Sequence, residues 1–287
     1  MRLICFFFAL VIATTAYSYE FKLALLHGNS EVFDYEINVL KLALKNAPGQ
    51  HSLEIIAVDH INQSRLLKNL KNEKNHFNVF FSGFTKQRER ELLQVDFPIT
   101  RGLLGYRVFA ILEKNLESLG LITQLGQFKQ GVSIGSGIGW PDTIIFQNSG
   151  FEVIETHYDG LWNMLKAGRI TAFNRGINEA FIEVEQQNSS LTDPKIVIDP
   201  HLMVVYPLDY FFYVSPLHPE LYKTIKEGLD IALKNGEFMQ AFYQHPRIKQ
   251  ALQQLKLTNR RVFKLHNPLL SERIINLPQS YWHQPDE

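Results

Sequence analysis

The chain has 287 residues, and its 29 lysines and arginines balance 29 aspartates and glutamates. Because no stretch is rich in basic residues, this balance argues against nucleic acid or an anionic membrane as the main partner. The single cysteine, Cys5, lies in an apolar N-terminal stretch and the 10 histidines lack metal-ligand spacing, so we expect neither disulfides nor a metal site.

Residues 1–18 have the composition of a cleavable signal peptide. A positive start at Arg2 is followed by an apolar run over residues 3–12 and by small residues at Ala16 and Ser18. The alternative is an uncleaved membrane anchor, but this run is too short for a helix that needs roughly twenty apolar residues to span a bilayer. We therefore expect export with cleavage between Ser18 and Tyr19, which leaves enough chain for one large domain or two lobes.

From residue 21 the sequence alternates short apolar runs with segments of helical periodicity. The apolar runs predict strands, and the segments between them predict helices because their apolar residues recur every three or four positions. The predicted strands cover residues 21–26, 53–58 and 79–81, and the predicted helices cover 35–44 and a segment through Leu66, Leu67 and Leu70. This βαβαβ order predicts a parallel sheet covered by helices.

Beyond Pro98 the sequence predicts a long extended run over residues 101–112, and a second α/β series follows it. Pro141 is well placed in the first turn of a helix, and Gly168 is typical of a helix end. Predicted strands cover 130–134, 151–155, 170–173, 195–199 and 210–214, and predicted helices cover 141–148, 161–167, 177–187, 221–234 and 238–243. The remainder of the chain is expected to be an irregular tail.

Two α/β series joined in this way predict two lobes with a hinge. The chain would cross near residues 100–108 and return near 207–210, which assigns residues 19–107 and 208–287 to lobe 1 and residues 108–207 to lobe 2. Ligands of open α/β sheets bind beyond the carboxyl ends of the strands. Two facing lobes would therefore enclose a cleft lined by their strand-to-helix loops.

Several segments carry a more specific signal. They cover residues 82–88 (SGFTKQR), 95–98 (VDFP), 102–109 (GLLGYRVF), 137–143 (GIGWPDT), 165–169 (LKAGR), 172–176 (AFNRG) and 211–215 (FFYVS). Together, and in this order, they resemble the family 3 extracellular solute-binding proteins, the periplasmic receptors of polar amino-acid importers. The resemblance implies a periplasmic clamp of two lobes, each a mixed sheet flanked by helices, which is the type II periplasmic binding fold. It also implies a monomer that delivers a small polar ligand to the permease of an ABC transporter.

The same fold also serves as the sensing domain of membrane signalling proteins and, in the cyclohexadienyl dehydratases, as an enzyme. Such an enzyme needs an acid/base carboxylate in the cleft, and Glu179 is the candidate that the sequence offers. The spacing of residues indicates neither a Ser-His-Asp arrangement nor a metal-activating cluster, and no cysteine follows Cys5. We therefore expect a binding protein without a cofactor rather than an enzyme.

Arg88 is the first candidate ligand-binding residue of lobe 1. The resemblance implies that it holds the ligand's α-carboxylate, and its planar guanidinium matches a carboxylate with two hydrogen bonds. Thr85 is placed to begin the helix and to add a hydroxyl donor, and Ser82 belongs to the same segment. The alternative is that Arg88 is one exposed charge in the charged run 88–91. Tyr35 would either form an aromatic wall of the cleft or pack against its neighbours.

A glycine-rich turn over residues 135–139 supplies candidates from lobe 2. The backbone amides of Ser136 and Gly137, just before a helix, could hold an anion, although such turns are also common connectors. The glycine spacing does not match the dinucleotide-binding pattern. Trp140 would either stack on the ligand or pack in the core.

Asn174 and Arg175 follow the end of a predicted strand in lobe 2, which is again a cleft position. The resemblance would place an aspartate nearby to bind the ligand's ammonium group, whereas this chain has Gly176 there and Glu179 three residues on. An arginine that faced Arg88 across the cleft would suit a dianionic ligand. Alternatively, Arg175 pairs with a glutamate and has a structural role.

Overall fold

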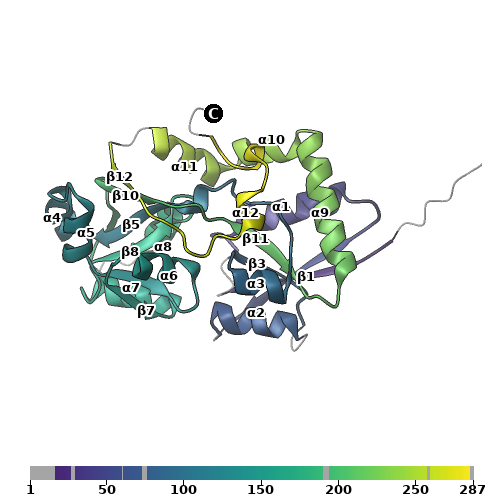
Figure 1. The fold of residues 1–287 in the computed structure, drawn as a ribbon, viewed down its shortest axis with the longest axis horizontal. Coiled ribbons are helices and arrows are strands. Elements are labelled where there is room, and N and C mark those ends of the chain that lie inside the picture. Colours follow the sequence, from purple (N-terminus) through teal and green to yellow (C-terminus); the bar gives the residue numbers. More distant parts are fainter. Residues whose placement is uncertain are drawn as a thin grey trace, which may run out of the picture.

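The computed structural model describes residues 17–26, 30–59, 61–72, 76–189, 194–256 and 259–284. The expected signal peptide falls almost wholly on residues 1–16, which lie outside this part of the chain, so its cleavage stays a prediction. Figure 1 shows two lobes side by side, one containing β1 (Glu20–Leu26) and α9 (Pro219–Lys234) and the other containing β5 (Tyr106–Leu112) and β8 (Ala172–Gly176). Within the described residues, no helix combines the length and the apolar character needed to cross a membrane.

Five strands form the sheet of the first lobe, in the order β2-β1-β3-β11-β4. β1 pairs in parallel with β2 and with β3, which confirms the predicted βαβαβ unit. β11 enters from the far end of the chain and runs antiparallel to β3 and β4. The strands are β1 (Glu20–Leu26), β2 (Ser52–Val58), β3 (Val79–Gly83), β4 (Leu93–Gln94) and β11 (Tyr210–Val214).

Helices cover both faces of this sheet. Successive side chains of a strand point to opposite faces, and β11 is apolar on both. Phe212 and Val214 pack in one core with α1 and α9, whereas Phe211 and Tyr213 pack in a second core with α2. The helices of this lobe are α1 (Asp34–Asn46), α2 (Gln63–Lys71), α3 (Lys86–Glu91), α9 (Pro219–Lys234), α10 (Glu237–Gln244) and α11 (Pro246–Lys256).

The sheet of the second lobe has the order β12-β10-β5-β8-β6-β7, with β9 paired to β5. β6 pairs in parallel with β7 and β8, whereas β5 runs antiparallel to β8, β9 and β10. The strands are β5 (Tyr106–Leu112), β6 (Ile134–Gly137), β7 (Val153–Thr156), β8 (Ala172–Gly176), β9 (Ile196–Ile198), β10 (Leu202–Val205) and β12 (Arg261–Lys264). The helices are α4 (Leu116–Gly120), α5 (Leu125–Gly131), α6 (Pro141–Asn148), α7 (Tyr158–Lys166) and α8 (Ala180–Gln187).

Two predicted elements differ from the structure. The strand expected at residues 130–134 begins only at Ile134, because the preceding residues end α5, whose first turn is stabilised by a capping box between Gln124 and Gln127. The extended run expected at 101–112 begins only at β5. Before it, Arg101 and Gly102 adopt φ angles of 54° and 88°, and a short 3₁₀ turn (Leu103–Gly105) follows.

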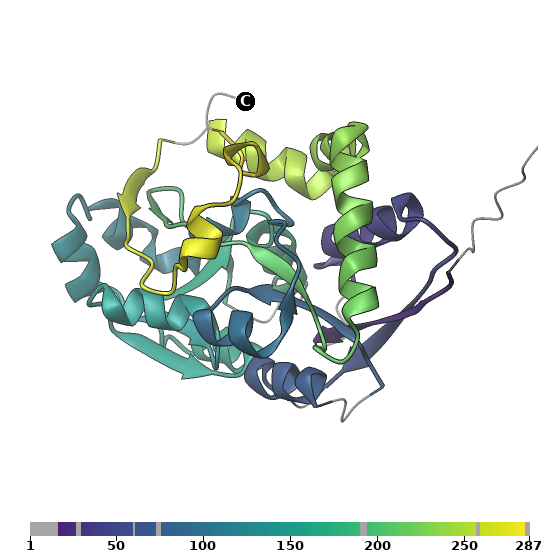
Figure 2. The same cartoon turned by 45° about the vertical axis from the view of Figure 1, so that its right-hand side comes forward.

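The C-terminal segment is not an irregular tail confined to one lobe. After α11 the chain returns to the second sheet, where β12 pairs in parallel with β10. It then crosses back to the first lobe, where Arg273 of α12 (Glu272–Ile275) forms an ion pair of 2.6 Å with Asp96. Figure 2 shows this yellow segment running from one lobe to the other. The predicted boundaries at 107/108 and 207/208 stay a prediction, but β12 departs from the assignment of residues 208–287 to lobe 1 alone.

Candidate functional site

A cavity lies between the two lobes, at the carboxyl ends of the parallel strands. The first lobe contributes Leu26 and Gly83, which end β1 and β3, and Tyr210, which begins the antiparallel β11. The second lobe contributes Gly137 at the end of β6 and Arg175 near the end of β8. The space between these walls is about 870 Å³, part of it open to solvent. This is the place at which the sequence predicted a cleft.

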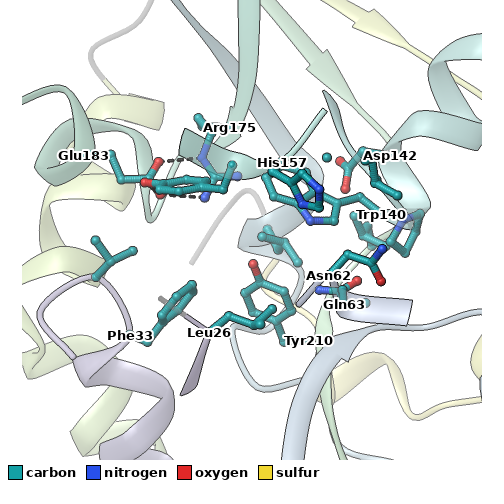
Figure 3. A pocket seen from close by; sticks show the side chains of 18 of the residues that line it. Leu26, Phe33, Asn62, Gln63, Trp140, Asp142, His157, Arg175, Glu183 and Tyr210 are labelled. Atoms are coloured by element: carbon teal, nitrogen blue, oxygen red, sulfur yellow. Dashed lines mark hydrogen bonds and ion pairs between the residues drawn. The ribbon is translucent and has the colours of Figure 1, made fainter. Parts of the chain in front are cut away.

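Aromatic side chains form much of the cavity wall (Figure 3). Phe33 and Tyr210 come from the first lobe, and Trp140 and Tyr158 come from the second. Pro141 starts α6 directly after Trp140, and Tyr158 starts α7 one residue after β7 ends, so both rings stand at strand-to-helix turns. Such turns are where an α/β fold can present side chains to a ligand without breaking its sheet.

Arg175 is bound by two glutamates in the cavity wall. Its Nη2 atom lies 2.9 Å from Oε2 of Glu179, and its Nε and Nη2 atoms donate to Glu183 at 2.5 and 2.7 Å. Its guanidinium also lies over the rings of Trp140 and Tyr158, at 5.0 and 5.7 Å from their centroids. Figure 3 shows the two hydrogen bonds to Glu183 as dashed lines. Of the two readings of Arg175 from the sequence, pairing with glutamate is the one seen in the structure.

Tyrosines complete the hydrogen bonds of these glutamates. Tyr158 Oη donates to Glu183 at 2.9 Å, and Tyr210 Oη, from the opposite lobe, donates to Glu179 at 2.5 Å. Burial raises the pKa of Glu183 more than Arg175 lowers it, so this pKa lies above its usual range. Burial is also the largest single influence on Glu179, but the guanidinium groups of Arg175 and Arg107, together with hydrogen bonds from Tyr210 and Gly176, outweigh it and hold the pKa of Glu179 below its usual range. Glu179 is therefore ionised at neutral pH.

A second ion pair lies deeper in the same wall. Arg107 Nε is 3.1 Å from Oδ1 of Asp142, and Tyr206 Oη donates to the same oxygen. Asn174 is fully buried beside this pair. In the amide orientation that satisfies both of its polar atoms, it donates to Gly135 O at 2.7 Å and accepts from Arg107 Nη2 at 3.2 Å. Asn174 therefore supports the wall from inside the lobe and does not line the cavity.

Arg88 lies beside the cavity rather than in its wall, and only 7% of it is exposed. Its Nη1 atom donates to Ser82 Oγ at 2.9 Å and to the carbonyl of Gly83. Its Nη2 atom donates to Gln63 Oε1 and to the carbonyl of Gly139, both at 2.9 Å. Gly139 belongs to the second lobe, so Arg88 joins the two lobes directly. It is not the exposed helix charge of the alternative reading, and its expected contact with a carboxylate stays a prediction.

The remaining candidates have local partners. Thr85 caps the start of α3, since its Oγ1 accepts from the backbone N–H of Arg88 at 3.1 Å. Ser136 is buried and accepts from Thr143 Oγ1 at 2.8 Å. Tyr35 is 1% exposed and packs in the core of the first lobe, where its hydroxyl donates to Ile99 O at 3.1 Å. Of the predicted site residues, the structure brings Gly137, Trp140 and Arg175 together at the cavity.

Several cavity residues escaped the sequence analysis. Tyr158 and His157 follow β7, and Tyr210 begins β11, so their positions at strand ends are a signal that could have identified them. Glu183 lies inside α8, where nothing in the sequence separates it from the exposed Glu185. Within the described part of the chain, no three histidines, aspartates or glutamates come together as a metal site would need.

Comparison of the sequence with protein-family models and with curated proteins gives no match. Solved structures do match. An ancestral arginine-binding protein bound to arginine aligns with a TM-score of 0.56 at 15% identity, over 78% of this chain and 97% of that one. A histidine kinase sensor domain similar to periplasmic binding proteins aligns with a TM-score of 0.58 at 14% identity, over 77% and 93% of the two chains.

A third structure is an ancestral amino-acid-binding protein described as a precursor of cyclohexadienyl dehydratase. It aligns with a TM-score of 0.56 at 11% identity, over 78% of this chain and 94% of that one. Two of these three proteins are binding proteins and the third is a sensor domain. Their TM-scores of 0.56–0.58 show a common fold, and at identities of 11–15% the likeness extends to the fold alone and not to a ligand. The chain therefore has the two-lobed, type II fold of the amino-acid-binding periplasmic proteins.

Proposed function

We propose that this protein is a periplasmic solute-binding protein that captures a small polar ligand between its lobes for a membrane transporter. The observation that carries the proposal is the cavity at the strand ends, whose walls come from both lobes. Closure is supported by bonds that run from lobe to lobe, namely Arg88 to Gly139 and Tyr210 to Glu179. A clamp of this kind changes shape when a ligand binds its closed form more tightly than its open form.

A second candidate function is ligand sensing for a membrane signalling protein. It is favoured by the match to a histidine kinase sensor domain, whose TM-score of 0.58 is as high as the 0.56 of the arginine-binding protein. Both functions use the same closure of two lobes, so the cavity supports them equally. The two functions differ in the membrane protein that recognises the closed form.

Catalysis has less support. Glu179 does not line the cavity, and both of its oxygens accept hydrogen bonds, from Tyr210 Oη at 2.5 Å and from Gly176 N at 3.3 Å. Its lowered pKa also makes it a poor proton donor at neutral pH. We therefore propose a binding protein rather than a dehydratase.

A thermal-shift screen of residues 19–287 tests the proposed binding function. The screen covers amino acids, dicarboxylates, amines, small peptides and neutral polar compounds. A true ligand at a hundred times its dissociation constant stabilises the folded protein by about 2.7 kcal/mol. Small-angle X-ray scattering should then show a smaller radius of gyration with that ligand. If no compound in any class stabilises the protein or changes its scattering, the proposed function is wrong.

A further inference from the structure

The charged groups of the cavity point to the kind of ligand that it accepts. Among the described lining residues, the guanidinium groups are those of Arg107 and Arg175. Each is already bound to carboxylate: Arg107 to Asp142 at 3.1 Å, and Arg175 to Glu179 and Glu183 at 2.9 and 2.5 Å. Both guanidinium groups that line the cavity are therefore already paired with carboxylates, of which Asp142 and Glu183 also line it.

The guanidinium of Arg88, beside the cavity, is occupied as well. Its two terminal nitrogens donate four hydrogen bonds to uncharged oxygens of Ser82, Gly83, Gln63 and Gly139. A ligand carboxylate in the cavity would therefore meet guanidinium groups that are already paired. It would have to displace a buried glutamate from Arg175, and an unpaired buried charge is strongly unfavourable.

A cationic group, in contrast, finds two kinds of partner. Glu183 lines the cavity and accepts three hydrogen bonds in the structure, from Tyr158 and twice from Arg175. A carboxylate has about four acceptor positions, so one more donor can bind it. Trp140 and Phe33 add aromatic surface from opposite lobes, and aromatic faces attract cations, most strongly where water is excluded.

We infer that the cavity selects an organic cation without a carboxylate, such as a protonated amine or a guanidinium compound, with its cationic group directed at Glu183. This inference rests on the proposed binding function and narrows its ligand. It separates this chain from a receptor for α-amino acids. The inference rests on the ion pairs of Arg107 with Asp142 and of Arg175 with Glu179 and Glu183.

Matched pairs of amino acids and their decarboxylated amines test the inference, because the members of a pair differ only in the carboxylate. Isothermal titration would compare agmatine with arginine, cadaverine with lysine, histamine with histidine and tyramine with tyrosine. We expect at least one amine to bind, and to bind at least about tenfold more tightly than its parent amino acid. Equal or tighter binding of the amino acid in that pair overturns the inference.

Variants identify the group that binds the cation. Glu183→Gln keeps the size of the side chain and an acceptor for Tyr158, so it should fold and lose about tenfold or more in affinity for the amine. Glu185→Gln, on the exposed side of the same helix, should bind as the wild type does. If Glu183→Gln does not fold, the matched pairs on the wild-type protein decide alone.

The outcomes also separate this inference from the proposed function. If an amino acid, a dicarboxylate or a neutral compound binds and closes the lobes while the amines do not, the proposed function stands and the inference fails. If no compound of any class binds, the proposed function itself fails, and the inference fails with it.

Discussion

The hydroxyl of Tyr210, in the first lobe, donates to Oε1 of Glu179, in the second lobe, at 2.5 Å. Burial, together with Glu179, raises the pKa of Tyr210 well above its usual range, so the phenol keeps the proton that it donates. Tyr210 is the first residue of β11, and Glu179 directly precedes α8. The closed arrangement is therefore stabilised in part by the protein's own side chains.

Replacing this tyrosine should favour the open form. Tyr210→Phe removes a hydrogen bond to an ionised carboxylate, which contributes about 1.5 to 3 kcal/mol in a buried place. We expect a larger radius of gyration by small-angle scattering and weaker ligand binding. Tyr213→Phe is the matched control on the same strand, because the hydroxyl of Tyr213 donates to Gln94 and Gly83 within the first lobe. If Tyr210→Phe and the wild type give the same scattering, this hydrogen bond does not stabilise the closed form.

Arg88 should matter for stability as well as for closure. Arg88→Ala leaves the buried acceptors of Ser82 and Gly83 without their donor, and each such loss costs about 1 to 3 kcal/mol. We expect a lower melting temperature even without ligand, and Arg88→Lys should recover part of it. Arg90→Ala, an exposed charge of the same helix, should melt as the wild type does. A normal melting temperature combined with lost binding would favour the carboxylate contact expected from the sequence.

Gly139 should be intolerant of a side chain when the lobes are closed. A Cβ at this position would lie 2.1 Å from Ser64 Oγ in the other lobe, and the residue has a φ angle of 78°. Gly168 has a similar φ of 68°, but nothing lies within 4 Å of its ideal Cβ. Gly139→Ala and Gly168→Ala therefore share the backbone strain, while only the first blocks closure. Ligand affinity should fall for Gly139→Ala and not for Gly168→Ala. Equal affinities would show that closure does not bring Gly139 against Ser64.

Glu36 should make folding less favourable as the pH rises. Burial raises its pKa to about 7, although Arg247 partly opposes the shift. A carboxyl with a raised pKa is held protonated by the fold, so its contribution to stability is full below about pH 4.5 and is lost as the pH rises toward 7. The whole shift corresponds to roughly 3 kcal/mol of unfolding free energy.

Denaturant titrations from pH 4.5 to 8 measure this effect. Glu36→Gln cannot ionise, so its unfolding free energy should fall less over this range than that of the wild type. Burial also raises the pKa of Asp209 to about 7, so the unfolding free energy of Glu36→Gln should still fall in part as Asp209 ionises. Glu54→Gln, at an exposed position, is the control. If the curves of Glu36→Gln and the wild type are parallel, Glu36 is not protonated in the folded protein.

The alternation of apolar runs and helical periodicity was enough to predict β1 to β3, β7 to β9, α1, α2 and α6 to α10, because burial leaves a strong local pattern in them. It predicted neither the strands β4 and β10 nor the helices α4, α5 and α11. It was not enough for β12. Its four residues alternate between half-buried and exposed, and the strand exists only because β10, some 59 residues earlier at Leu202, offers an edge to Arg261. The turn at Arg101 was missed for a related reason: its positive φ is fixed by distant contacts, including those of its guanidinium with the carbonyls of Ser280 and Trp282.

The same distinction between local and long-range information applies to the residues of the candidate site. Trp140 and Gly137 could be placed at the cavity because a strand ends and a helix begins beside them, which is local information. The partners of Arg88 could not be predicted, since Gln63 and Gly139 lie 25 and 51 residues away in the sequence. Arg175 could be seen as a cleft residue, but its pairing with Glu183 depends on which face of α8 turns inward.

The way in which the C-terminal segment returns to the second lobe also sets an order for folding. A chain that emerges from its N-terminus cannot finish the first sheet until β11 (Tyr210–Val214) is available. It cannot finish the second sheet until β12 (Arg261–Lys264) has followed. Neither lobe can therefore mature alone during synthesis, and an incomplete chain keeps the edges of β10 and β3 unpaired. Nearly the whole polypeptide must be present before either half of the clamp reaches its final form.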